Sequence, residues 1–384
     1  MKFEFATATR IIFGPGMVEE AAPLAADMGK HAMVVTGQNP DRPAPVSAAM
    51  NEKGIATMSF AVPGEPTIQM IRSGVRQAKT AGCDMVIAIG GGSVIDAGKA
   101  IAVLLTNPGE MSDYLEVIGP GQPLTQPPAP CIAIPTTAGT GAEVTCNSVI
   151  ASPDHQVKVS LRSPMMFPRI AIADPELTHS VPPHVTAATG LDALTQVTEA
   201  YVSHKATPLT DPICREGIRR AARSLRRVFE NGNDRAARED MALVSLFGGL
   251  ALANAKLGAV HGLAGPLGGM FPIPHGVICG QLLPHVMAAN VRALQMRDPA
   301  SPALDRYNEV ARILTGTADA DEGVAWVREL CEAMELPGLT QYGLKAEDFP
   351  TVAEKALNAS SIKGNPIRLT DEELIGILHQ ASAA

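Results

Sequence analysis

The strongest constraint on the fold is a short apolar segment that ends in a glycine-rich turn and continues as a helical pattern. Residues 84–89 (DMVIAI) have the nearly uninterrupted apolar character of a strand buried on both faces. Gly90-Gly91-Gly92-Ser93 follows at once, and a helix is predicted from about Val94 to Leu105. Strands buried on both faces belong to parallel sheets with helices on either side. The feature therefore predicts an α/β fold with a parallel sheet.

Strand and helix patterns alternate through the first half of the chain, whereas helical patterns dominate the second half. Further strands are predicted at residues 32–36, 55–62, 131–135 and 169–173, with a helix at residues 67–81. Beyond Pro183, apolar residues recur with the 3.6-residue period of helices, at residues 184–203, 212–230, 236–257 and 303–315. We therefore expect two domains, an α/β domain over residues 1–182 and an all-helical domain over residues 183–384.

Composition excludes several classes of function. The chain has 384 residues, a net charge of −8 and only 4% aromatic residues, which is unfavourable for binding nucleic acid. The six cysteines form no CxxC pair, and the N-terminus lacks the apolar core of a signal peptide. The most apolar stretches contain charged residues and many glycines, so no membrane span is predicted. We expect a cytoplasmic protein with a small-molecule partner.

Two loops at strand ends are suited to binding phosphate. In the first, glycines allow the backbone to approach an anion, and Gly91, Gly92 and Ser93 open a helix whose first N–H groups point at it. The second loop, residues 135–141 (PTTAGTG), supplies hydroxyls from Thr136, Thr137 and Thr140. Each loop has a simpler explanation, as a tight turn or as threonines bonding their own backbone. Together they favour a dinucleotide at the carboxyl edge of a parallel sheet.

Residues of the helical half could bind a metal ion. Asp192 and Gln196 are four positions apart in a helical pattern, so they share a helix face. His261 is predicted near the end of an apolar helix, and His275 follows a loop containing glycine and proline. A carboxylate and two imidazoles are suitable ligands for zinc or ferrous iron. The alternative is that the histidines are hydrogen-bonded core residues, and spacing alone does not separate the two.

Several long motifs, in order, resemble the iron-containing (group III) alcohol dehydrogenase family. They run from a Phe13–Gly16 turn to residues 258–276, and they include the glycine turn, residues 135–145 (PTTAGTGAEVT), residues 174–177 (DPEL) and residues 189–201 (TGLDALTQVTEAY). The resemblance implies a dehydroquinate synthase-like fold, with a dinucleotide-binding α/β domain and a helical domain. It also implies hydride transfer between a nicotinamide and a small alcohol, aldehyde or ketone, in a homodimer.

The resemblance assigns roles to individual residues. By this correspondence the cofactor residues are Gly37, Gln38, Gly91, Gly92, Ser93, Asp96, Thr136, Thr137, Thr140 and Lys158. The metal ligands, for iron or zinc, map to Asp192, Gln196, His261 and His275. For Lys158 a solvated strand charge is the alternative. The sequence assigns no catalytic acid or base.

Two positions depart from the family pattern in the metal region. Gln196 replaces a histidine ligand, and its neutral amide oxygen is a weaker ligand than imidazole for iron or zinc. Gly265 stands where relatives have a further histidine. We expect metal binding to survive through Asp192, His261 and His275. The rival is a metal-independent reductase similar to maleylacetate reductase.

Two other interpretations use the same fold differently. A dehydroquinate synthase-like lyase needs cationic residues around a substrate phosphate, and the arginines of residues 219–227 are instead spaced as a solvated helix face. The second interpretation is a binding protein with this fold that has lost its catalytic activity.

Cofactor choice depends on the turn after the first predicted strand. Relatives carry an aspartate there that bonds the adenosine ribose, whereas this chain has Gly37 followed by Gln38, with Arg42 nearby. Loss of the carboxylate removes repulsion of a 2′-phosphate, and Arg42 can pair with one. The sequence is compatible with NAD or NADP, and we expect dual use.

Overall fold

The computed structural model describes residues 2–155 and 157–382, and these divide into two compact units. The α/β unit contains residues 6–137 and 141–178. The helical unit contains the described parts of residues 1–5, 138–140 and 179–384. A domain boundary between residues 182 and 183 remains our proposal, because compactness alone does not show that each part folds on its own.

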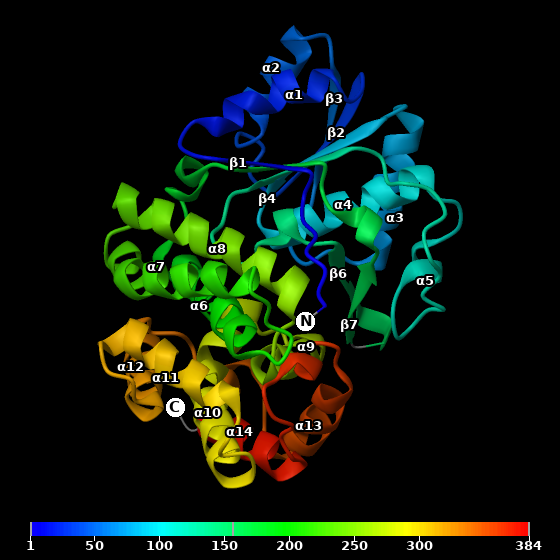
Figure 1. Cartoon of the computed structure of the whole chain (residues 1–384). Coiled ribbons are helices and arrows are strands. Elements are labelled where there is room, and N and C mark those ends of the chain that lie inside the picture. The colour runs from blue at the N-terminus through cyan, green and yellow to red at the C-terminus, as the bar shows by residue number, and fades with distance from the viewer. Residues whose placement is uncertain (1, 156, 383–384) are drawn as a thin grey trace. The chain divides into compact units, whose positions relative to one another are not determined.

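The α/β unit is built on a six-stranded parallel sheet (Figure 1). Its strands are β1 (Arg10–Phe13), β2 (His31–Thr36), β3 (Ala56–Ala61), β4 (Met85–Gly90), β5 (Cys131–Pro135) and β8 (Ile170–Ala173), in the order β1-β8-β5-β4-β2-β3. Each neighbouring pair is parallel. The chain passes from β2 outward to β3 and then returns to β4 on the other side of β2, so the strand order reverses between β2 and β4. Ligands of doubly wound sheets bind beyond the carboxyl ends of strands at such a point.

Helices cover both faces of this sheet. They are α1 (Ala21–Ala26), α2 (Ala44–Glu52), α3 (Ile68–Thr80), α4 (Gly92–Thr106) and the short α5 (Met111–Tyr114). Val34 of β2 packs in one core cluster with residues of α1 and α2, and its neighbour Val35 packs in another with residues of α3 and α4. Successive side chains point to opposite faces, so a strand covered on both sides needs an apolar residue at every position. This is the pattern that the sequence shows at residues 84–89.

A two-stranded antiparallel hairpin completes the α/β unit. It consists of β6 (Asn147–Ser152) and β7 (Val157–Arg162). The strands predicted at residues 32–36, 55–62, 84–89, 131–135 and 169–173 are confirmed to within one residue at each end, as is the helix at residues 67–81. The hairpin, β1 and the helices α1 and α2 were not predicted.

The described part of the helical unit contains nine α-helices and no strand. They are α6 (Pro183–Val202), α7 (Thr210–Glu230), α8 (Arg235–Ala255), α9 (Ala259–Met270), α10 (His275–Arg297), α11 (Pro302–Thr315), α12 (Ala320–Ala333), α13 (Phe349–Asn358) and α14 (Asp371–Ser382). The four long helices predicted from periodicity correspond to α6, α7, α8 and α11. Helix α6 is buried along nearly its whole length, so its polar residues lie inside the unit.

A sharp bend separates α8 from α9, and it corrects the predicted position of His261. The axes of the two helices differ by 100°, and Lys256 between them has a positive φ of 59°. Gly258 follows, where a Cβ atom would lie 2.7 Å from Asn365 Oδ1 and 2.8 Å from Glu199 Oε1. The chain therefore turns before position 261. His261 lies in the first turn of α9 and not near the end of the preceding helix.

Helix α10 is long and apolar enough to cross a membrane, but 72% of the relevant segment is buried inside the protein. Helices α8 and α9 pass the same test only as a pair, and they are bent by 100°. Burial of these helices in the core accounts for their apolar character.

Candidate metal centre and cofactor-binding edge

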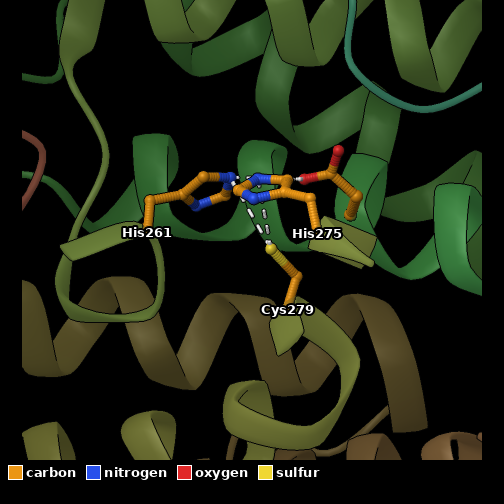
Figure 2. A group of neighbouring side chains, drawn as sticks. His261, His275 and Cys279 are labelled. Carbon is orange, nitrogen blue, oxygen red and sulfur yellow. Dashed lines mark hydrogen bonds and ion pairs between the residues drawn. The ribbon is translucent and has the colours of Figure 1, made fainter. Parts of the chain in front are cut away.

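Four side chains that can bind a metal converge inside the helical unit. Asp192 comes from α6, His261 from the first turn of α9, and His275 and Cys279 from the first two turns of α10. One donor atom from each residue lies within 4.8 Å of the others. Figure 2 shows the two imidazole rings facing each other, with the Cys279 sulfur joined by dashed lines to both.

The cluster is largely enclosed by protein. Asp192 Oδ1 lies 3.2 Å from His261 Nε2 and 3.8 Å from His275 Nε2. Asp192, His261 and Cys279 are buried, whereas the His275 side chain is 39% exposed. The His275 imidazole is thus partly accessible to solvent, whereas the other three donors are enclosed. Such openness distinguishes a catalytic metal site from a purely structural one.

Glu199 fixes the orientation of His261. Its Oε2 lies 2.7 Å from His261 Nδ1, and its Oε1 accepts a hydrogen bond from the backbone N–H of Val260 at 2.7 Å. A carboxylate at Nδ1 favours the tautomer whose other nitrogen, Nε2, can bind a metal. Gly258 permits this arrangement, because a side chain there would collide with Glu199.

Gln196 contacts the cluster through its amide nitrogen. Its Nε2 donates to Asp192 Oδ1 at 3.2 Å. Its Oε1 is buried and has no hydrogen-bond partner among the described residues. That oxygen lies toward Gly248, where an added Cβ would be only 2.5 Å away. The amide nitrogen, which cannot bind a metal, is therefore the atom directed at Asp192.

The buried charges shift each other's pKa values. Burial raises the pKa of Asp192, but the charges of His275 and His261 more than offset it, so the pKa lies below the usual value. Burial lowers the pKa of His261, but Cys279, Asp192 and Glu199 outweigh it and raise the pKa well above the usual value. The pKa of His275 is raised for similar reasons, against burial and the charge of His261.

The structure brings together the predicted Asp192, His261 and His275, and it adds two residues that the sequence analysis missed. Glu199 lies seven residues after Asp192, and that spacing on one helix is a signal that could have identified it. Cys279 lies four residues after His275, but no helix beginning at His275 was predicted from the sequence. That helix start is what puts both side chains on one face.

Several predicted cofactor residues gather at one edge of the α/β sheet. Gly37 and Gln38 follow β2, Gly91, Gly92 and Ser93 follow β4, and Thr136 and Thr137 follow β5, three neighbouring strands. Helix α4 begins at Gly92 without a side-chain cap, so its first N–H groups are directed at whatever lies beyond the strands. Arg42 reaches this edge and donates to Thr136 Oγ1 at 3.0 Å.

Three predicted cofactor residues, Asp96, Lys158 and Thr140, do not directly follow a strand of the sheet. Asp96 pairs with Lys99 at 3.0 Å and accepts the backbone N–H of Val149 at 3.0 Å. Lys158, in β7, pairs with Glu65 at 2.5 Å. Thr140 belongs to the helical unit. Asp96 and Lys158 thus already have partners within the α/β unit, and their roles toward a cofactor remain proposals.

Comparison with known proteins identifies the family. The family described as "Iron-containing alcohol dehydrogenase" matches residues 8–175, and "Fe-containing alcohol dehydrogenase family, C-terminal" matches residues 186–382. The chain belongs to the iron-containing alcohol dehydrogenase family. This confirms the resemblance seen in the sequence and the expected α/β-plus-helical fold.

Named relatives span almost the whole chain. Alcohol dehydrogenase 4 of Saccharomyces cerevisiae (strain YJM789) is 35% identical over 383 residues, covering 96% of each protein. The 1,3-propanediol dehydrogenase of Klebsiella pneumoniae is 34% identical, covering 99% of this chain and 98% of the relative. A solved 1,3-propanediol oxidoreductase superposes with a TM-score of 0.91 at 33% identity, covering 99% of this chain and 100% of the other.

Family membership favours a dehydrogenase over the lyase considered from the sequence. The arginines of residues 219–227 support the same conclusion, because each pairs with an acidic side chain of the helical unit. These pairs are Arg219–Glu216, Arg220–Glu216, Arg220–Asp240, Arg223–Asp240, Arg226–Glu230 and Arg227–Asp234. Their charges are neutralised within the unit.

Proposed function

We propose that this member of the iron-containing alcohol dehydrogenase family interconverts a small alcohol and its aldehyde or ketone, with NAD or NADP as the hydride partner. The observation that carries the proposal is the convergence of Asp192, His261 and His275 in a partly open cluster. A carboxylate and two imidazoles fit a divalent metal, iron or zinc. The names of the relatives, an alcohol dehydrogenase and a 1,3-propanediol dehydrogenase, support an alcohol or aldehyde substrate.

The metal, when bound, supplies a Lewis acid that polarises the substrate oxygen. The protein's own residues prepare that place. Glu199 holds His261 with Nε2 toward Asp192, and Gln196 holds the Asp192 carboxylate by a hydrogen bond to the same Oδ1. Fixing the donors in advance reduces the entropy lost on binding.

The glycine turn before α4 fits the pyrophosphate of a dinucleotide. Its helix is fifteen residues long and begins without a side-chain cap, so the first N–H groups and the positive end of the helix dipole are available to an anion. Gly37 offers no carboxylate to repel a 2′-phosphate, and Arg42 is held close by at Thr136. We therefore propose that both NAD and NADP are used.

The substrate is proposed to be bulkier than the smallest alcohols. Gly265 is four residues after His261 on α9, so it lies on the same face of that helix. An added Cβ at Gly265 would meet no atom within 4 Å. Open space one turn from a metal-binding imidazole can accept a larger aldehyde or ketone. We further propose that the protein forms a homodimer and is located in the cytoplasm.

The test combines elemental analysis with turnover. Purified protein is analysed for iron and zinc before and after chelation, and NADH and NADPH oxidation is followed with a series of aldehydes and ketones. We expect about one metal per chain, with activity lost on chelation and restored by the metal. A metal-free protein with full activity would instead establish the metal-independent reductase. Absence of nicotinamide turnover with every carbonyl compound would contradict the dehydrogenase assignment.

A further inference from the structure

The donor cluster contains one residue that the family pattern does not account for, the thiol of Cys279. It lies four residues after His275 on α10, so both side chains leave the helix on the same face. Cys279 is buried, and its Sγ lies 3.6 Å from His275 Nε2 and 3.9 Å from His261 Nε2. The thiol is thus directed toward the imidazoles.

The spacing of the donor atoms matches a tetrahedral site. Metal–nitrogen and metal–oxygen bonds of 2.0–2.2 Å and one metal–sulfur bond of 2.3 Å place the corners of a tetrahedron about 3.3–3.7 Å apart. Asp192 Oδ1 lies 3.2 Å from His261 Nε2 and 3.8 Å from His275 Nε2, and Cys279 Sγ lies 3.6 Å and 3.9 Å from the Nε2 atoms of His275 and His261, all within about 0.4 Å of this range. The four donors are therefore spaced closely enough for one small cation to bind all of them, and the substrate oxygen would then be a fifth ligand.

Gln196, by contrast, is arranged to orient a ligand. Its Nε2, which has no free electron pair to offer a metal, donates to Asp192 Oδ1 at 3.2 Å. Its Oε1 lies next to Gly248. Rotating the amide to exchange the two atoms would set Oε1 against the negatively charged carboxylate oxygen, with no hydrogen between them. The local charges therefore favour the observed orientation.

We propose that the Cys279 thiolate is the fourth protein ligand of the metal, and that Gln196 positions Asp192. The inference rests on the proposed metal site. Binding releases the thiol proton to solvent as the sulfur–metal bond forms. A carboxylate, two imidazoles and a thiolate make a softer donor set than a carboxylate with three imidazoles. Softer sets favour zinc over harder divalent metals, so zinc is the expected resident metal.

The test is the absorption spectrum of the full-length protein after its metal is replaced by Co²⁺, because a cobalt–thiolate bond produces an intense near-ultraviolet charge-transfer band. We expect this band in the wild type, at one cobalt per chain. It should disappear in Cys279→Ser and persist in Gln196→Ala. The matched control is Cys331→Ser, a half-buried cysteine of α12 in the same unit, which should leave the band unchanged.

Zinc affinity gives a second readout. Loss of an orienting residue typically costs 10–100-fold in metal affinity, so Cys279→Ser, which removes a ligand, should cost at least about 100-fold and more than Gln196→Ala.

The possible results separate the ligand assignment from the metal site itself. A wild-type protein that binds cobalt without the charge-transfer band would overturn the assignment of Cys279 and leave the proposed function intact. A band that survives in Cys279→Ser would do the same. A wild type that binds no cobalt or zinc would overturn both. The wild-type spectrum alone decides the question if Cys279→Ser does not fold.

Discussion

Each unit of this protein buries a group of charges, and the two groups are satisfied in different ways. In the α/β unit the Lys99 ammonium is 2% exposed, and its three N–H donors meet three acceptors at 3.0 Å, on Asp96, Thr145 and the carbonyl of Ala142. In the helical unit, Asp192, His261, His275 and Cys279 converge with no lysine or arginine among them. The first group carries its own cation, whereas the second is built to receive one.

The contrast shows that burial of charge does not by itself mark an active site. A buried ion pair with every hydrogen bond made belongs to the framework, because removing one partner leaves an uncompensated charge. Donor atoms that converge around a common point, with one imidazole open to solvent, belong to a binding site. Changes in the two groups should therefore affect different properties of the protein.

The largest expected effect is the loss of metal and activity in Asp192→Ala. This substitution removes the carboxylate that lies near both imidazoles. Because loss of a mere orienting residue already costs 10–100-fold in metal affinity, loss of this ligand should lower affinity and turnover by more than about 100-fold. Metal analysis and NADH oxidation measure both, with the exposed Asp305→Ala as control. Full activity of the Asp192→Ala variant would contradict the proposed role of the metal in turnover.

Lys99→Met should damage stability and leave the metal site in place. It leaves Asp96, whose side chain is 14% exposed, without its ion pair. Breaking a buried pair in this way costs about 3–5 kcal/mol in the free energy of unfolding. Urea unfolding measures the loss, and Lys79→Met, at an exposed position of α3, is the control. If folded Lys99→Met protein lost its metal, the buried ion pair of the α/β unit and the donor cluster of the helical unit would not be independent, which would contradict this prediction.

Glu199→Gln should weaken metal binding by less than Asp192→Ala. The neutral amide no longer favours the His261 tautomer that directs Nε2 at the cluster. Substitution of such partners costs about 10–100-fold in metal affinity. Zinc titration against a chelating indicator measures it, beside the exposed Glu322→Gln. Unchanged affinity would mean that Glu199 only packs the helices together.

The smallest expected effect concerns pH and the α/β unit. Glu143 is 1% exposed, and burial raises its pKa from 4.5 to about 7. Between these values the folded protein keeps a proton that the unfolded chain releases, so stability falls as pH rises through this window. Glu143→Gln removes that dependence, and it should gain roughly 1–3 kcal/mol over the wild type on going from pH 4.5 to pH 8.

Unfolding of both proteins by urea at the two pH values tests this. The difference between wild type and Glu143→Gln isolates the residue from other titrating groups. A difference that does not change with pH would refute the role of Glu143.

The sequence predicted the fold best where burial is complete. Strands β2, β4 and β5 are nearly continuous apolar runs because helices cover both faces, and such runs are readable without a structure. Strand β1 is only partly buried, and the hairpin of β6 and β7 alternates buried and exposed residues over a short length. These weaker patterns do not stand out from loops.

The site was predicted only as far as local spacing and resemblance allowed. Asp192, His261 and His275 follow from the family motifs, and the structure brings them together. The contacts of Cys279 and Glu199 with the histidines depend on the tertiary structure. In that structure His261 lies in the first turn of α9, and α10 begins at His275. The orientation of the Gln196 amide depends on the charge of its neighbour, which spacing cannot reveal.

All the proposed metal-binding atoms come from α6, α9 and α10, whereas the glycine turn that fits the pyrophosphate follows a strand of the sheet. The residues proposed to bind a metal and those proposed to anchor a nicotinamide thus belong to separately built parts. On this proposal, substitutions at Gln196 or Cys279 should change metal preference without altering the turn at Gly91. The choice of metal and the choice of coenzyme can then change independently of each other.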